Sequence, residues 1–313
     1  MSTAIEMVPT KNHGYSYEAA LTASQKANWR IEDIIGGDKR LDFSKPFMPE
    51  ALAWMDKLTF LTPDEKRILN QIRGNTYLAI FELVEEFILP FALDEARPHL
   101  LDDDYRLRAL LQLASEEAKH IQLFKTFKKE FKEGFGTECS VIGPPEDVAK
   151  AVLAHQPLAV AIAILQIEWM SQRHYLESIK DDQELDPQFK SLLKHHWVEE
   201  AQHAKTDTLV VEWLAEGKSE AEIMEAIEEF LEIGSFLDAG LTQQVEFDLD
   251  AFMRATGREL TDAEKDEIRR VQKQANRWTY LGSGMTHEKV LATLEGLSPK
   301  ARQRIESVAP AFC

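Results

Sequence analysis

Hydrophobic positions in this chain recur every three or four residues, the spacing of amphipathic helices, and no stretch shows the two-residue period of a strand. Thr62 followed by Pro63 is a typical helix start, and the helix that begins there must kink or end at Pro90. Four further long helices are expected at about 103–132, 157–180, 186–215 and 219 to the 250s, the last interrupted near Gly234 or Gly240. The pattern predicts an all-α protein.

Shorter segments fill the rest of the chain. Residues 1–15 look irregular, residues 38–50 carry two prolines and should be extended, and a capping box at 261–264 begins a late helix. Short helices are expected at about 16–33, 144–155, 287–295 and 298–308. We therefore predict a single all-helical domain, with a bundle core at about 63–215 and extra helices at about 16–50 and 219–313.

The composition narrows the range of partners. The 313 residues include 54 acidic and 36 basic side chains, a net charge of −18, which argues against nucleic acid or an anionic membrane as the main partner. The two cysteines exclude a disulfide scaffold and a multi-thiolate metal site. The longest uncharged run, 151–167, is short for a membrane span, and the first residues lack a signal-peptide pattern. We expect a cytoplasmic protein.

Two of the expected long helices carry the same motif, Glu-x-x-His: Glu117 with His120, and Glu200 with His203. Residues three apart on a helix share a face, so the two side chains of each motif point the same way. One such motif could be an incidental histidine on a solvated face. Two copies flanked by apolar residues favour metal ligands, because an unpaired buried carboxylate costs several kcal/mol and a bound cation removes that cost.

Two more glutamates fit the pattern of a dinuclear carboxylate bundle, in which two helices give Glu-x-x-His and two give one Glu each. Glu168 lies in the most apolar helix of the chain, AIAILQIEWM, where a solvated charge is hard to explain. The first long helix offers Glu82, Glu85 and Glu86, of which Glu85 lies nearest the apolar face and Glu82 next. We expect Glu85 to be the ligand, with Glu82 as the alternative.

A further histidine, His196, lies four residues before Glu200 and therefore on the same helix face. The competing interpretation is a surface histidine, as we expect for its neighbour His195. We include His196 in the predicted ligand set.

Glu116 and Glu199 come directly before the two motif glutamates. A metal-bound histidine usually donates its second ring N–H to a carboxylate. In a bundle the natural arrangement is crossed, with Glu116 towards His203 and Glu199 towards His120. The alternative is that both carboxylates are solvated.

These motifs resemble the ferritin-like di-iron carboxylate superfamily, and the added His196 is similar to a feature of the p-aminobenzoate N-oxygenase family. That family consists of non-haem di-iron enzymes that oxidise an aryl amine to hydroxylamine, nitroso or nitro products. The resemblance covers about 63–215 and implies a ferritin-like four-helix bundle with additional N- and C-terminal helices and two iron ions, Fe/Fe or Mn/Fe. The implied ligands are Glu85 (or Glu82), Glu117, His120, Glu168, His196, Glu200 and His203.

The function this implies is a di-iron oxygenase that uses O2 to oxidise a small organic substrate, and the resemblance to the N-oxygenase family implies an aryl amine. No flavin, nicotinamide or phosphate-binding motif is present, so electrons would come from an external donor. Inward-facing apolar residues are the expected pocket walls: Phe81, Leu113, Phe124, Leu165 and Leu192. The amphipathic helices after residue 219 need a partner surface, either the bundle or a second subunit, so a homodimer is expected.

Three other functions remain open at this point. One is a ferroxidase or metal-handling ferritin-like protein without an organic substrate, and another is a helical scaffold without metal. The third is an oxidase like the ribonucleotide reductase small subunit. That family usually carries Tyr one turn after the first motif histidine, where this chain has Phe124.

Overall fold

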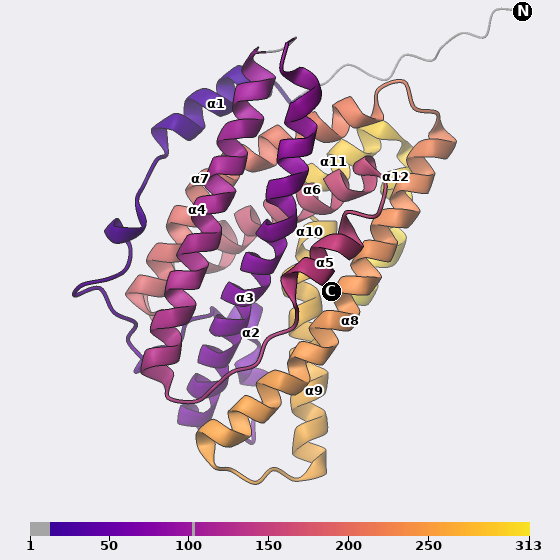
Figure 1. The fold of residues 1–313 in the computed structure, drawn as a ribbon. Coiled ribbons are helices and arrows are strands. Elements are labelled where there is room, and N and C mark those ends of the chain that lie inside the picture. Colours follow the sequence, from indigo (N-terminus) through magenta and orange to yellow (C-terminus); the bar gives the residue numbers. More distant parts are fainter. Residues whose placement is uncertain (1–12, 102–103) are drawn as a thin grey trace, which may run out of the picture.

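Four long helices form the centre of the molecule, which is described by a computed structural model over residues 13–101 and 104–313. They are α3 (Pro63–Ala96), α4 (Asp104–Phe135), α6 (Pro157–Arg173) and α7 (Pro187–Ala215). Helix α3 packs along α4, α6 packs along α7, and α4 meets α7, so the two pairs close into a bundle (Figure 1). The expected all-α fold is confirmed: a four-helix bundle with additional N- and C-terminal helices.

The start of α3 follows from its sequence. The Thr62 hydroxyl accepts a hydrogen bond from the Glu65 backbone N–H, and the Glu65 carboxylate accepts one from the Thr62 N–H. This capping box satisfies donors that the first helical turn leaves free. The helix does not end at Pro90 but continues to Ala96. A proline there removes one backbone hydrogen bond, and burial of Ile88 and Phe91 beside it offsets the loss.

Helix α8 (Glu220–Thr256) differs from the prediction, because it runs without interruption past Gly234 and Gly240. A Cβ atom at Gly240 would lie 3.2 Å from the Ile142 side chain, and one at Gly234 would lie 3.6 Å from Met285. Gly240 therefore permits close packing inside a continuous helix, whereas a Cβ at Gly234 would make an ordinary contact. The helix ends instead at Gly257, whose φ of 65° suits a left-handed cap.

The first helix is also shorter than expected. Helix α1 spans Tyr17–Lys26, and a separate 3₁₀ turn at Ile31–Asp33 follows it, where one helix over 16–33 was predicted. Residues 38–49 are extended or turn structure before α2 (Glu50–Ala53), and a 3₁₀ turn at Met55–Lys57 leads towards α3. The predicted irregular N-terminus lies mostly outside the described residues, which begin at position 13.

Two π-helical turns extend long helices. One, His174–Ile179, continues α6 through the region predicted as its end, and the other, Trp278–Gly282, follows α9 (Asp262–Arg277). Such turns hold one extra residue each and frequently mark functional sites. The remaining short elements are α5 (Pro145–Val152), α10 (Ser283–Met285), α11 (Glu288–Leu297), α12 (Pro299–Val308) and 3₁₀ turns at Arg97–His99 and Ala309–Phe312.

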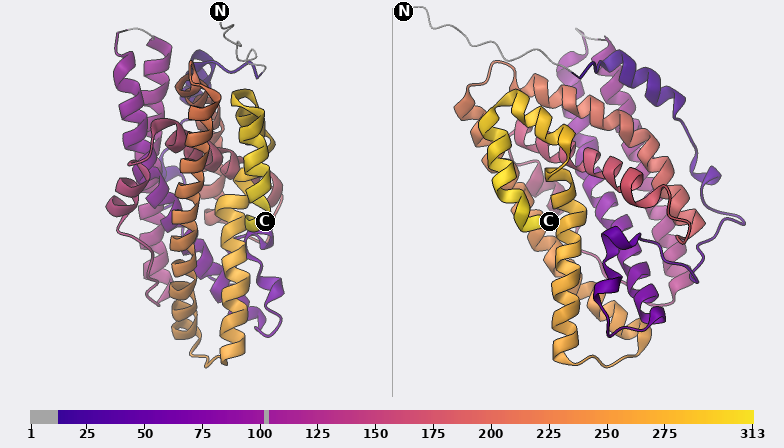
Figure 2. Two further views of the ribbon diagram at one scale, coloured as in Figure 1. Left: turned by 90° about the vertical axis from the view of Figure 1, so that its right-hand side faces the viewer. Right: turned by 180° about the vertical axis from the view of Figure 1, so that it is seen from behind.

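The C-terminal helices cover one side of the bundle. Helix α8 packs against both α3 and α6, and α9 runs beside α8 (Figure 2). The apolar faces of these helices therefore find a surface within the same chain, and the homodimer stays a prediction. Among residues 13–101 and 104–313, no helix combines the length and apolar character needed to cross a membrane.

Candidate metal centre

The predicted ligands come from all four bundle helices and meet between them. Helix α3 contributes one, α4 two, α6 one and α7 three, and each of these side chains is at most 3% exposed. They are Glu85, Glu117, His120, Glu168, His196, Glu200 and His203. Seven ionisable side chains buried at one place in the core need a physical explanation, because buried charges are stable only when paired or bound to a cation.

Ligand atoms of these residues lie close enough to hold metal ions. Two groups, each with its donor atoms within 4.8 Å of one another, share His120 and Glu200. One group adds Glu85 and His196, and the other adds Glu117 and His203. Glu168 belongs to neither group, but its carboxyl is hydrogen-bonded to Glu200.

The outer nitrogens of the two motif histidines are held by crossed hydrogen bonds. His120 Nε2 lies 2.8 Å from Glu199 Oε2, and His203 Nε2 lies 3.0 Å from Glu116 Oε2. Carboxylates only accept, so each imidazole donates its Nε2–H. This is the crossed arrangement predicted above, and it leaves both Nδ1 atoms as acceptors that face the centre.

The inner atoms of the cluster are close together but poorly aligned for hydrogen bonds. His203 Nδ1 lies 2.8 Å from Glu117 Oε1, and His120 Nδ1 lies 3.0 Å from Glu200 Oε1. Within the described part of the chain, several buried atoms here have no hydrogen-bond partner: Glu85 Oε2, both Glu117 oxygens, Glu168 Oε2, Glu200 Oε1, and Nδ1 of His120 and His203. Buried polar atoms without partners are rare in native proteins. Here they are all potential metal ligands, so the residues fit a pair of cations.

Charge supports the same conclusion. Counting Glu116 and Glu199, six glutamates are buried around three histidines. Burial raises the pKa of Glu85 to about 8 and that of Glu168 well above its usual range. Burial opposes protonation of His196, but Glu200 and Glu85 outweigh it and raise its pKa to about 9. The site therefore attracts positive charge, whether protons or metal ions.

The glutamates behind the histidines are held firmly. Glu116 accepts hydrogen bonds from the Ser24 hydroxyl at 2.6 Å and from Gln112 at 2.9 Å, besides the one from His203. Burial raises the pKa of Glu116, but these hydrogen bonds and the His203 charge outweigh it and lower the pKa to about 2. Glu116 thus stays ionised and orients the ring of His203.

The sequence left two questions about the ligands open: whether Glu85 or Glu82 is the ligand from α3, and whether His196 is a ligand or a surface residue. The structure shows where each of these side chains lies. Glu82 lies outside both groups, since its carboxylate contacts Lys128 at 2.9 Å and Lys125 at 3.8 Å, whereas Glu85 faces the cluster. His196 belongs to the cluster, with Nε2 2.9 Å from Glu85 Oε1. The neighbouring His195 points elsewhere, and its Nδ1 contacts the Ser191 carbonyl oxygen at 2.7 Å.

Two features of the site were missed by sequence reasoning. Asp207, four residues after His203, is buried with one oxygen unpartnered in the described structure. Burial raises its pKa well above the usual range, and its i+4 spacing from a motif histidine could have revealed it. The second feature is Lys119, which contacts Glu199 Oε1 at 2.5 Å and lies 4.0 Å from the Trp29 ring centre. Trp29 comes from a non-helical segment, so no spacing indicated this contact.

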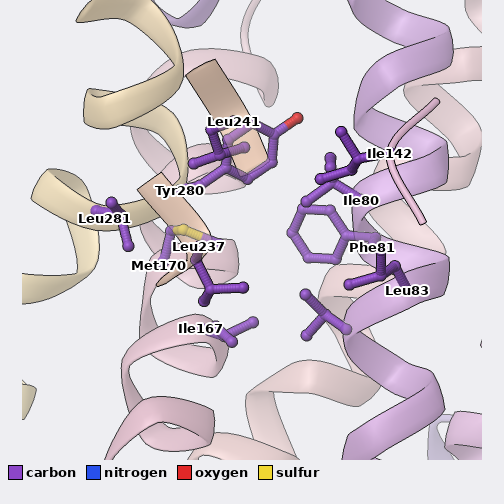
Figure 3. Close-up of a pocket in the computed structure, with 11 residues that line it drawn as sticks. Ile80, Phe81, Leu83, Ile142, Ile167, Met170, Leu237, Leu241, Tyr280 and Leu281 are labelled. Carbon is purple, nitrogen blue, oxygen red and sulfur yellow. The ribbon is translucent and has the colours of Figure 1, made fainter. Parts of the chain in front are cut away.

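The predicted pocket walls differ from the residues that line the cavity in the structure. An apolar cavity does lie beside the bundle (Figure 3), but of the five expected residues only Phe81 lines it. The other four are tightly packed core residues: Leu113, Phe124, Leu165 and Leu192. The cavity forms instead where α8 and the second π turn meet α3 and α6, and this junction cannot be seen from the bundle helices alone.

Comparisons with known proteins give only a distant likeness. No family model matches the chain, and no curated protein sequence matches it. Solved structures of an R2-like ligand-binding oxidase with a Mn/Fe cofactor are similar. A valine-to-leucine variant is 16% identical over 86% of this chain and 93% of that chain, with a TM-score of 0.45. A tyrosine-to-phenylalanine variant is 15% identical, with the same coverage and a TM-score of 0.46. A likeness this distant assigns no activity, so the function must come from the chemistry of the site.

Proposed function

We propose that this chain is a non-haem oxidoreductase that uses two metal ions, Fe/Fe or Mn/Fe, to oxidise a small organic substrate with O2. The observation that carries the proposal is the pair of buried Glu-x-x-His motifs whose unpartnered donor atoms converge with Glu85 and Glu168. Carboxylate oxygens with a few imidazoles suit iron and manganese better than softer metals. When bound, such a metal pair supplies the redox chemistry that activates O2.

The chain's own residues prepare this centre. Glu116 and Glu199 fix the tautomers of His203 and His120, so that Nδ1 of each ring is free to bind a cation. Glu117, Glu200, Glu85, Glu168 and His196 complete the proposed ligand set. The surrounding apolar side chains exclude water, which keeps the electrostatic interactions of the site strong.

The finer proposal is N-oxygenation of an aryl amine, ArNH2 + O2 + 2 H⁺ + 2 e⁻ → ArNHOH + H2O. The presence of His196 in the cluster supports it, because the resemblance to arylamine oxygenases rests on that residue. The two electrons need an external donor. The apolar cavity beside the cluster favours an organic substrate over iron oxidation alone, which needs no such space.

Metal analysis followed by a product assay tests the proposal. The protein is reconstituted anaerobically with Fe²⁺, reduced with dithionite, and exposed to O2 with an aryl amine. We expect about two iron ions per chain, as the two donor groups require, and a hydroxylamine or nitroso product by mass spectrometry. A folded protein with under about one tenth of an equivalent of iron or manganese would overturn the proposal. Oxidation of Fe²⁺ without any amine product would favour a ferroxidase.

A further inference from the structure

One end of the apolar cavity lies next to the metal centre, from which Phe81, Val84 and Ile167 separate it. Phe81, Val84 and Ile167 line this cavity and also line a smaller hollow next to it. That hollow is bounded by Glu85 and Glu168 and by two further members of the cluster. A molecule in the cavity would therefore have one end directed at the proposed metals.

The other end of the cavity holds a polar atom that lacks a partner. Tyr280, in the π turn after α9, is 6% exposed, and its hydroxyl makes no hydrogen bond within the described residues. Figure 3 shows this oxygen directed towards Ile142, away from Ile167 at the end near the metals. A buried hydroxyl without a partner destabilises a fold, so its retention needs a reason.

Two buried charges of opposite sign act on the Tyr280 hydroxyl, so neither is an unopposed counter-ion for a ligand. Arg73 of α3 and Asp248 of α8 are both buried, and neither lines the cavity. Burial raises the pKa of the Tyr280 hydroxyl, the charge of Arg73 lowers it and that of Asp248 raises it again. The net effect keeps the hydroxyl protonated, so Tyr280 can donate a hydrogen bond. A carboxylate placed here would lose its hydration without gaining an unopposed counter-ion.

Building on the proposed function, we infer that this cavity, whose open volume is about 30 Å³, becomes the substrate chamber when a guest displaces its flexible lining side chains. It takes a neutral molecule with an apolar body whose far end accepts a hydrogen bond from the Tyr280 hydroxyl. The side chains that contact the body are aliphatic or aromatic, as Ile80, Met170 and Leu241 illustrate (Figure 3). Among aryl amines, the chamber should therefore prefer 4-aminoacetophenone to 4-aminobenzoate. The first places a ketone at the Tyr280 end, and the second places a carboxylate there.

Binding to the metal-free protein tests this inference by calorimetry, without depending on turnover. Acetophenone and ethylbenzene have the same apolar body, and only the ketone accepts a hydrogen bond. We expect acetophenone to bind about tenfold more tightly than ethylbenzene. In Tyr280→Phe the ratio should fall to about one, because the donor is gone. Benzoate should bind more weakly than acetophenone.

Matched variants control for folding and for the place of binding. Leu241→Trp fills the chamber and should abolish binding of both ligands, whereas Leu176→Trp, at a position 49% exposed, should leave binding unchanged. Helical circular dichroism and thermal melting verify each variant. Tyr280→Phe decides the question if Leu241→Trp does not fold, since it removes one oxygen that has no partner in the described structure.

Three results would overturn the inference: no binding of acetophenone, a preference for the ketone that survives in Tyr280→Phe, or tighter binding of benzoate. Because the protein is metal-free, a failure to bind iron in the separate reconstitution would remove the proposed function and leave the chamber intact. Conversely, a protein that binds two irons but not acetophenone would remove only the chamber.

Discussion

Two clusters of polar side chains are buried in this molecule. Both contain atoms without a hydrogen-bond partner in the described residues, Asp248 Oδ2 and Arg73 Nε among them, but the clusters differ in composition. In the cluster between α3, α4, α6 and α7, six glutamates surround three histidines, and the unpartnered atoms converge. In the cluster between α3 and α8, Asp248 Oδ1 accepts hydrogen bonds from the Thr76 hydroxyl at 2.7 Å and from Gln244 at 2.8 Å, and the positive charge of Arg73 acts on the same carboxylate.

The difference lies in the balance of charge. Arg73 and Asp248 supply opposite charges, so the second cluster is close to neutral without any added ion. The first cluster has more carboxylates than cationic groups, and protons alone satisfy it only by raising several pKa values. An excess of one sign in a dry interior therefore indicates a bound ion, whereas a balanced polar cluster indicates structure.

The largest expected effect comes from removing a motif histidine. His120→Ala and His203→Ala should each lose at least one metal ion per chain and all activity, because each deletes a donor from the convergent groups. Inductively coupled plasma mass spectrometry measures the metal content. His174→Ala and His195→Ala are the controls and should retain full metal content. Equal metal loss from His195→Ala would contradict the observed orientation of α7.

The balanced cluster should instead respond to pH. Burial raises the folded-state pKa of Asp248 to about 6, above its ordinary value of 3.8. Because the folded-state pKa of Asp248 is raised, this carboxyl contributes its full stabilisation below pH 3.8, where it is protonated. That contribution is lost as pH rises through about 6 and the carboxyl ionises. The asparagine in Asp248→Asn does not titrate. As pH rises from about 4 to about 7.5, the free energy of unfolding of the variant should therefore increase relative to that of the wild type, by up to about 3 kcal/mol. Urea melts at both pH values measure this, and a pH-independent difference would refute it.

A smaller effect is expected from the carboxylates that orient the motif histidines. Glu116→Gln and Glu199→Gln should weaken metal binding by about 10- to 100-fold, because the imidazoles lose their ionised acceptors. Competition with a metal-chelating dye measures the affinity. Glu82→Gln is the matched control, since Glu82 pairs with Lys128 outside the cluster. If Glu82→Gln weakens metal binding as much as Glu116→Gln, the effect is one of general charge rather than orientation.

The smallest effect is a gain. Tyr280→Phe removes a buried hydroxyl that is unpartnered in the described residues, so it should stabilise the fold by about 1 kcal/mol. Thermal unfolding of the metal-free protein measures the change. A clearly lower melting temperature would show that the hydroxyl already has a partner in the folded protein, such as a buried water.

The helices and the cluster could be predicted from the sequence because both depend on local spacing. The capping residues at Thr62 and Ser219 mark real helix starts, and the three-residue spacing in each Glu-x-x-His motif places both side chains on one face. Glu85 was preferred over Glu82 on the same basis. These features depend on residues that are neighbours along one helix.

The cavity and the contacts behind the cluster could not be predicted because they depend on packing between distant segments. Tyr280 reaches the chamber from a π turn near the end of the chain, and Trp29 stacks on His120 from a loop near its beginning, with ring centres 5.8 Å apart. Gly234 and Gly240 were expected to interrupt α8, whereas Met285 and Ile142 pack against them. No periodicity within a helix encodes which distant segment will cover it.

The continuous α8 helix has a consequence for how this protein could diversify. Its residues Leu237 and Leu241 form part of the chamber wall, yet none of the predicted metal ligands lies on it. Exchanges on this helix or on the adjoining π turn can reshape the space offered to a guest molecule while the bundle keeps its donor atoms in register. The protein can thus acquire new substrate specificities without any change in its proposed metal ligands.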